Sequence, residues 1–229
     1  MRYPDRKSTQ RRAKPFAEAV PSAPASLRSR KQQVVRDALS AAALELFLAH
    51  GFEAVTVEAI ARTAGVSRRT FFRYYKSKED VMVEYLDRDG ERFLTELAAR
   101  PLDEPPLLAI RNALIPAVAY GLQEPELVRD VTRLLRETNA LRRALMERRN
   151  RFEERIAALM IQRLGTTSAD NTPILLAFLT RALNDTAINA WYDHETDDIR
   201  GLIDDLISRL YTIVTDMPPE FNKPRQSSR

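Results

Sequence analysis

The chain has 229 residues and no cysteine, with 44% hydrophobic residues, 30% charged residues and a formal net charge of +4. This composition can bury a sizeable core, and it excludes disulfides and thiolate chemistry. The sequence shows no apolar run long enough to span a bilayer and no signal-peptide pattern, so we expect a cytoplasmic protein without membrane contact.

The positive charge is concentrated at the amino-terminal end. Residues 1–26 carry +4 (six basic against two acidic), residues 27–78 carry +6 (ten against four), and residues 79–229 carry −6 (twenty against twenty-six). A phosphate backbone attracts the first two segments and repels the third. We therefore expect nucleic-acid binding in the first third and a different task, such as ligand sensing or self-association, in the remainder.

Residues 1–26 are rich in Arg, Lys, Pro, Ala and Ser and lack apolar periodicity, which predicts a disordered basic tail. Its basic residues either add DNA contacts or only keep the chain soluble. The next segment, 27–50, repeats apolar residues at helical spacing. We expect a helix there, with Phe47 in the core.

Residues 56–75 have the spacing of two short helices joined by a tight turn. Thr56 is a typical N-cap, so the first helix starts near Val57. Gly65 supplies the left-handed backbone that ends this helix, and Ser67 can cap the next one. Two short helices around a turn that contains glycine are typical of a helix-turn-helix motif.

The second of these helices carries cationic and hydroxyl-bearing side chains on its outward face. These residues are Arg68, Arg69, Thr70, Arg73 and Tyr74, while Phe71, Phe72 or Tyr75 packs inward. Arginine can donate two hydrogen bonds to a guanine edge, and the second helix of such a motif enters the major groove of DNA. The alternative is an ordinary solvated helix face.

A third helix begins after the cap sequence Ser77-Lys-Glu-Asp80. Lys78 lies at the positive end of this helix, where a cation is unfavourable. We interpret it as a contact to a DNA phosphate, against the alternative that a long lysine simply reaches solvent.

The residues from Gly51-Phe52 through 56–75 to Lys76-Ser-Lys-Glu-Asp80 resemble the DNA-binding head of TetR/AcrR transcriptional regulators. The resemblance implies that Thr56 lies at the DNA surface, and that position 72 is one where the family often has a phosphate-contacting tyrosine. Together with the outward face of the second helix, the predicted DNA-binding residues are Thr56, Ser67, Arg68, Arg69, Thr70, Arg73, Tyr74 and Lys78.

The rest of the chain is predicted to be helical throughout, because no strand alternation competes with the helical period. The expected helices are 78–99, 104–122, 125–136, 138–164, 172–193 and 197–215, separated by prolines and by Gly165. The fold class is therefore all-α. We expect a helix-turn-helix DNA-binding domain at 27–78, a helical effector-binding and dimerisation domain at 79–216, and a disordered tail at 217–229.

The last two predicted helices, 172–193 and 197–215, have apolar stripes wider than one internal contact requires. A symmetric pair of chains would cover them with a four-helix bundle and hold two recognition helices about 34 Å apart, one DNA turn. This predicts a homodimer on a near-palindromic operator. The alternative is that both stripes are satisfied inside a monomer.

The candidate ligand-binding residues are Arg133, Arg136, Asn184 and Trp191, which are polar or aromatic and lie on helices with apolar faces. For Trp191 a core or dimer role is also open. The stretch 67–75 together with Leu134-Leu-Arg136 and Leu141-Arg142 is similar to a TetR subgroup proposed to sense acyl-CoA-like molecules. This similarity implies a small hydrophobic or acyl-type effector.

Catalysis finds little support in the sequence. Its two histidines, His50 and His194, are far apart, and no serine lies in a nucleophile elbow. We expect no enzyme activity, no cofactor and no metal site, although acidic residues flank His194. The chain is predicted to be a ligand-responsive transcriptional regulator, most simply a repressor. The alternative is an activator or architectural DNA-binding protein without an effector.

Overall fold

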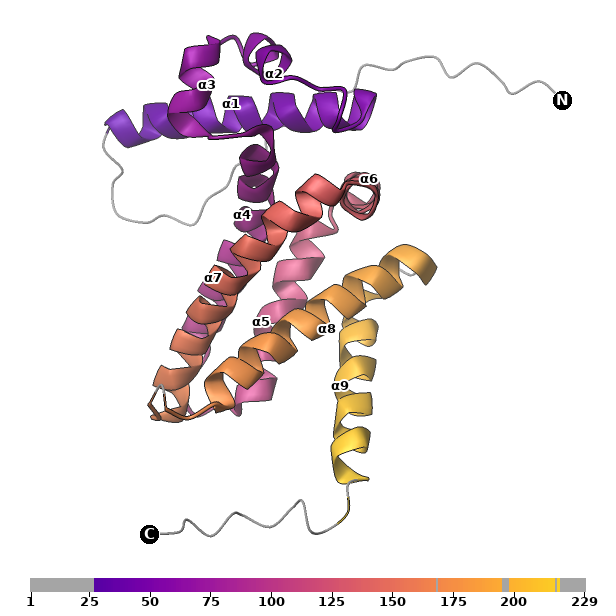
Figure 1. Ribbon diagram of the computed structural model, residues 1–229. Helices are drawn as coiled ribbons and strands as arrows, with labels where there is room; N and C mark the ends of the chain where they lie inside the picture. The colour runs from indigo at the N-terminus through magenta and orange to yellow at the C-terminus, as the bar shows by residue number, and fades with distance from the viewer. Residues whose placement is uncertain (1–26, 168, 195–197, 217, 219–229) are drawn as a thin grey trace, which may run out of the picture. The chain divides into compact units, whose positions relative to one another are not determined.

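The computed structural model describes residues 27–167, 169–194, 198–216 and 218. All regular secondary structure within these ranges is helical (Figure 1), which confirms the all-α prediction. The helices are α1 (Leu27–His50), α2 (Val57–Thr63), α3 (Arg68–Tyr74), α4 (Lys78–Ala99), α5 (Pro106–Gly121), α6 (Pro125–Glu137), α7 (Asn139–Leu164), α8 (Thr172–His194) and α9 (Ile199–Thr215). The predicted tails at 1–26 and 217–229 lie outside the described residues, apart from residue 218.

The chain divides into two compact units, with the boundary between Val81 and Met82. Helix α4 starts in the first unit and continues in the second. The predicted domain boundary at residue 78 therefore falls close to this division.

In the first unit, α2 packs against both α1 and α3 (Figure 1). Its core contains Leu39, Phe47, Phe52, Ile60 and Phe71, all at most 2% exposed. The rings of Phe47 and Phe52 lie 4.8 Å apart between centroids. This burial confirms Phe47 as a core residue and fixes the two short helices, which are too short to be stable alone.

The second unit is organised around α5, which contacts α7, α8 and α9. The side chains of α5 that face these helices are small or branched and fully buried, as at Ala109, Ile110 and Ala113. Trp191 of α8 and Ile203 of α9 complete the same hydrophobic core.

The helix ends follow the signals in the sequence. Ser77 Oγ accepts a hydrogen bond from the backbone amide of Asp80 at 3.2 Å, and Gly165 ends α7 in the left-handed conformation with φ of 59°. Pro106 and Pro125 occupy the first positions of α5 and α6, where the missing amide is tolerated. Within the described residues, no helix has the length and hydrophobicity that crossing a membrane requires.

Candidate DNA-binding surface and effector cavity

Helix α2 is held at both ends by local hydrogen bonds. Thr56 Oγ1 accepts from the Ala59 amide at 3.2 Å. At the other end Gly65 adopts φ of 69°, and the amide of Val66 donates to the Ala61 carbonyl at 2.9 Å. A residue with a side chain is strained in this conformation, so glycine fixes the turn between α2 and α3.

Helix α3 begins at a cap and buries one side. Ser67 Oγ accepts from the Thr70 amide at 3.1 Å, and Phe71 is fully buried. The opposite side of the helix is therefore turned outward. Arg68, Arg69 and Arg73 are exposed there, while Thr70 and Tyr74 are half-buried at the edge of the same surface.

The arginines of this surface are held only weakly by the protein. Arg68 Nε lies 2.6 Å from Glu58 Oε1, but both side chains of this ion pair are more than half exposed. Arg73 donates to the Tyr74 hydroxyl at 3.4 Å. Exposed pairs of this kind contribute roughly 0 to 1 kcal/mol, so a phosphate or a base edge can replace them at little cost.

Of the three aromatic residues named as candidates to pack inward, two do so. Phe71 and Tyr75 are buried, with ring centroids 5.7 Å apart. Phe72 is 46% exposed, and the guanidinium of Arg68 lies 5.4 Å from its ring centroid. Position 72 is thus part of the outward surface, but it brings no hydroxyl donor.

Lys78 has partners inside the first unit. Its ammonium donates to the carbonyls of Phe52 at 2.7 Å and Val55 at 3.0 Å, with a weaker contact to Glu53 at 3.4 Å. It also lies 4.4 Å from the centroid of the Phe52 ring. These bonds tie the start of α4 to the loop between α1 and α2. The phosphate contact of Lys78 stays a prediction.

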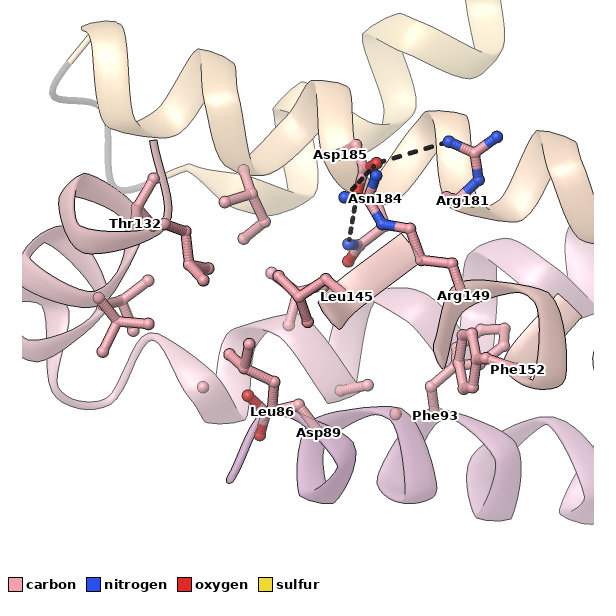
Figure 2. Close-up of a pocket in the computed structure, with 18 of the residues that line it drawn as sticks. Leu86, Asp89, Phe93, Thr132, Leu145, Arg149, Phe152, Arg181, Asn184 and Asp185 are labelled. Atoms are coloured by element: carbon pink, nitrogen blue, oxygen red, sulfur yellow. Dashed lines mark hydrogen bonds and ion pairs between the residues drawn. The ribbon is translucent and has the colours of Figure 1, made fainter. Parts of the chain in front are cut away.

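The second unit contains a cavity of about 570 Å³ between α4, α5, α6, α7 and α8. Its walls are mainly apolar, with Leu86 and Phe93 on α4 and Leu145 and Phe152 on α7 (Figure 2). The volume lies within the roughly 300 to 1,000 Å³ that drug-sized ligands occupy.

The structure brings two of the four candidate ligand residues to this cavity. Arg136 and Asn184 line it, and Asn189 does so as well. Arg133 is not among the lining residues and forms an exposed ion pair with Asp130. Trp191 is 1% exposed in the core, and the guanidinium of Arg129 lies 4.4 Å from its ring centroid. The ligand contacts predicted for Arg133 and Trp191 therefore find no support in the cavity lining.

The polar groups of the α7 and α8 wall are mostly paired with each other. Arg149 Nη2 lies 3.2 Å from Asp185 Oδ2, and Arg181 pairs with Glu153. Arg148 pairs with Asp87. Burial, together with the nearby charges of Arg149 and Arg151, lowers the pKa of Arg148 to about 10, so it remains a cation at neutral pH.

The α4 wall carries an acidic group that the sequence did not single out. Asp89 lines the cavity, and its side chain is exposed at the cavity wall. Burial raises the pKa of Asp89, and the positive charges of Arg92 and Arg88 reduce that rise. Burial, Asp89 and Glu124 together raise the pKa of Tyr85, one turn earlier, to about 12.

Helices α8 and α9 expose apolar side chains outside the core. Leu183, Trp191 and Ile203 from the predicted stripes point inward and are buried. The residues that remain exposed are Leu175 (64%), Phe178 (44%), Tyr211 (70%), Ile213 (66%) and Val214 (48%). The stripes are therefore only partly covered by the core of the second unit.

In the part of the chain that the structure describes, no group of three or more His, Cys, Asp or Glu side chains lies close enough together to bind a metal ion. The acidic segment around His194 includes residues 195–197, which lie outside the described residues.

Two family models match the chain. One, described as bacterial regulatory proteins of the tetR family, matches residues 39–85, and the other, the MftR C-terminal domain, matches residues 104–215. The first range contains α2 and α3, and the second contains the helices from α5 onward.

Individual proteins show the same similarity over most of the chain. The HTH-type transcriptional regulator TcmR of Streptomyces glaucescens is 32% identical over 218 residues, which cover 92% of this chain and 96% of TcmR. MftR of Mycobacterium tuberculosis, named as a mycofactocin biosynthesis transcriptional regulator, is 30% identical over 73% of this chain and 84% of MftR. The crystal structure of NalD, the secondary repressor of the MexAB-OprM multidrug efflux pump in Pseudomonas aeruginosa, aligns with a TM-score of 0.55 and 25% identity, covering 80% of this chain and 96% of NalD.

Proposed function

This chain belongs to the TetR family of DNA-binding transcriptional regulators, and we propose that it is a dimeric repressor which a small apolar or acyl-type effector releases from its operator. It is a regulator and not an enzyme. The proposed site of action is the cytoplasm, where bacteria, the source of these relatives, keep their chromosome.

The observation that carries the DNA-reading part is the outward face of α3. Ser67 caps this helix, Phe71 anchors it, and three arginines are exposed on the free side. We propose that Arg68 and Arg69 read base edges, with the other predicted contacts, Thr56, Ser67, Thr70, Arg73 and Tyr74, at bases or phosphates. A phosphate contact by Lys78 requires that its ammonium exchange the hydrogen bonds to the Phe52 and Val55 carbonyls for bonds to the phosphate.

The dimer part is supported by the uncovered apolar residues of α8 and α9. Leu175 and Phe178 lie on α8 one helical turn apart, and Ile213 and Val214 lie near the end of α9. Exposed leucine, isoleucine and phenylalanine at helical spacing are costly in water and favour a partner surface. We propose a second copy of the chain as that partner, so that two α3 helices reach successive grooves of a near-palindromic operator.

The effector part is supported by the cavity in the second unit. Most residues that line this cavity fall within 104–215, the range that the MftR C-terminal domain model matches. Helix α4 lines this cavity and also forms the last element of the DNA-binding unit. We propose that the effector binds more tightly to one arrangement of α4. Its binding then changes the distance between the two α3 helices of the dimer. Linkage then requires that operator DNA weakens effector binding by the same factor.

A selection from a random duplex library with the full-length chain tests this proposal. We expect an enriched sequence with two inverted half-sites, and we expect Arg68→Ala to lower affinity for it by about 10-fold or more. Arg151→Ala, an exposed arginine of α7 outside the cavity lining, is the matched control and should leave affinity within about 2-fold. Coating of all duplexes without preference would instead support an architectural protein.

A further inference from the structure

The cavity contains an acidic side chain that has no close partner among the described residues. Asp89 lies on α4 between Leu86 and Phe93 and faces the cavity with them (Figure 2). Within residues 27–167, 169–194 and 198–216, no hydrogen bond and no cation at ion-pair distance reaches its carboxylate. The other charged residues that line the cavity each have a hydrogen-bond or ion-pair partner: Arg136, Arg142, Arg148, Arg149, Arg181 and Asp185.

The arginines next to Asp89 in sequence are directed elsewhere. Arg92 lies over the ring of Tyr120, with its Cζ 3.2 Å from the ring centroid. Arg88 is the residue immediately before Asp89, and adjacent residues of a helix point to different faces. Both arginines therefore act on the carboxylate only at longer range, and their effect on its pKa is smaller than the effect of burial.

The end of α5 adds to the unfavourable surroundings of this carboxylate. Asp89 Oδ2 lies 3.8 Å from the point where a Cβ of Gly121 would be, and Gly121 is the last residue of α5. The carboxyl-terminal end of a helix carries partial negative charge. An anion at this place has no ion-pair partner at contact distance and is not stabilised by the helix end, so it favours a ligand that brings positive charge.

The opposite wall offers little free charge for an anionic ligand. Arg149 and Arg181 both contact Asp185, and Arg142 donates to the carbonyl of Arg136 at 2.5 Å. Figure 2 shows Asn184, Asp185 and Arg181 joined in this way on the side away from Asp89. An anionic ligand would have to break these existing ion pairs and hydrogen bonds before it could pair with an arginine, and the free energy lost offsets the free energy gained. The number of arginines in the cavity wall therefore overstates its affinity for anions.

We propose that Asp89 binds a protonated amine of the effector, which makes the effector a lipophilic amine with its apolar body against Phe93, Leu145 and Phe152. An ammonium group supplies both the missing charge and hydrogen-bond donors. A neutral hydroxyl would supply a donor but no positive charge, so the carboxylate would still have no ion-pair partner once the ligand displaces water from it. This inference rests on the proposed effector function of the cavity, and it puts an apolar amine in place of the acyl-type effector that the sequence similarity implied.

Three probes with the same apolar body separate the possibilities: phenylbutylamine, phenylbutanol and phenylbutanoate. Their binding to the full-length chain at neutral pH is measured by isothermal titration calorimetry. A charge-assisted hydrogen bond predicts that the amine binds about 10- to 100-fold more tightly than the carboxylate. Asp89→Asn should remove this preference and leave binding of the alcohol within about 3-fold.

The control is Asp103→Asn, which makes the same change of charge at an exposed residue outside the cavity and should keep the preference for the amine. Asp89→Glu, which retains the charge, should keep part of it. The proposal is overturned if the amine does not bind, if the carboxylate binds as tightly as the amine, or if Asp89→Asn retains the preference.

Release of DNA is measured separately, by anisotropy of a fluorescent duplex that carries the selected operator. If the amine binds through Asp89 but leaves the operator affinity unchanged, the amine site stands and induction through this cavity is wrong. If other compounds release the operator while no preference for amines exists, induction stands and the assignment of Asp89 is wrong.

Discussion

Replacing Lys78 separates two roles that the sequence and the structure give it. In the structure, its ammonium donates two short hydrogen bonds, to Phe52 at 2.7 Å and Val55 at 3.0 Å. Lys78→Met keeps the length of the side chain and removes both bonds, which leaves part-buried carbonyls without donors. Hydrogen bonds to charged groups contribute about 1.5 to 3 kcal/mol each, so we expect a loss of about 2 kcal/mol after partial replacement by water.

The loss should be local to the first unit, since all these contacts lie there. Hydrogen exchange of the full-length chain, followed by mass spectrometry, reports such local opening. A loss of about 2 kcal/mol corresponds to roughly 30-fold faster exchange of amides in α2 and the loop before it. Peptides from α8 should exchange at the wild-type rate.

The phosphate role predicts a different result. Loss of one phosphate contact lowers the slope of log affinity against log salt concentration by about 1 and leaves exchange in the free protein unchanged. Lys76→Met, an exposed lysine two residues earlier, is the control for a general loss of charge. If Lys78→Met changed only the salt dependence, the structural role that the carbonyl bonds indicate would be refuted.

Three further substitutions test the second unit. A Cβ at Gly90 would lie 2.9 Å from the ring of Phe152, so Gly90→Ala should shift that ring and weaken phenylbutanol binding several-fold in calorimetry, whereas Gly121→Ala, with its nearest contact at 3.8 Å, should not. Trp191→Ala should cost about 3 to 5 kcal/mol in urea unfolding, because the indole is 1% exposed in the core. Because the pKa of Asp89 is raised on folding, its ionised form lowers stability at neutral pH; Asp89→Asn should therefore raise the melting temperature at pH 7, and the gain should disappear as the pH falls toward the ordinary pKa of aspartate, about 3.9.

The helix boundaries were largely predictable because local chemistry sets them. The helix predicted at 78–99 is observed as Lys78–Ala99, where Ser77 caps the start. The last helix was predicted from residue 197 but begins at Ile199, because Asp198 caps it by accepting from the Gly201 amide at 2.8 Å. Caps of this kind use residues within a few positions, so the sequence displays them directly.

The cavity was much less predictable because it depends on contacts between distant helices. Asp89 lies in a charged stretch of α4 and has the pattern of a solvated acid; it is exposed, and only the packing of the other helices makes it part of a cavity wall. Trp191 fits a core position and a pocket position equally well by helical period, and the structure places it in the core. A polar residue on an amphipathic helix therefore cannot be assigned to a cavity from periodicity alone.

The mass of the complex on the selected operator duplex tests the central claim most directly. We predict two chains on one duplex, with a footprint of two equal half-sites about one DNA turn apart. Phe178→Glu, which places a charge on the exposed face of α8, should give a single chain in solution and lose this complex. A single wild-type chain bound to one site without half-sites would contradict the claim that α8 and α9 form a dimer which presents two α3 helices to DNA.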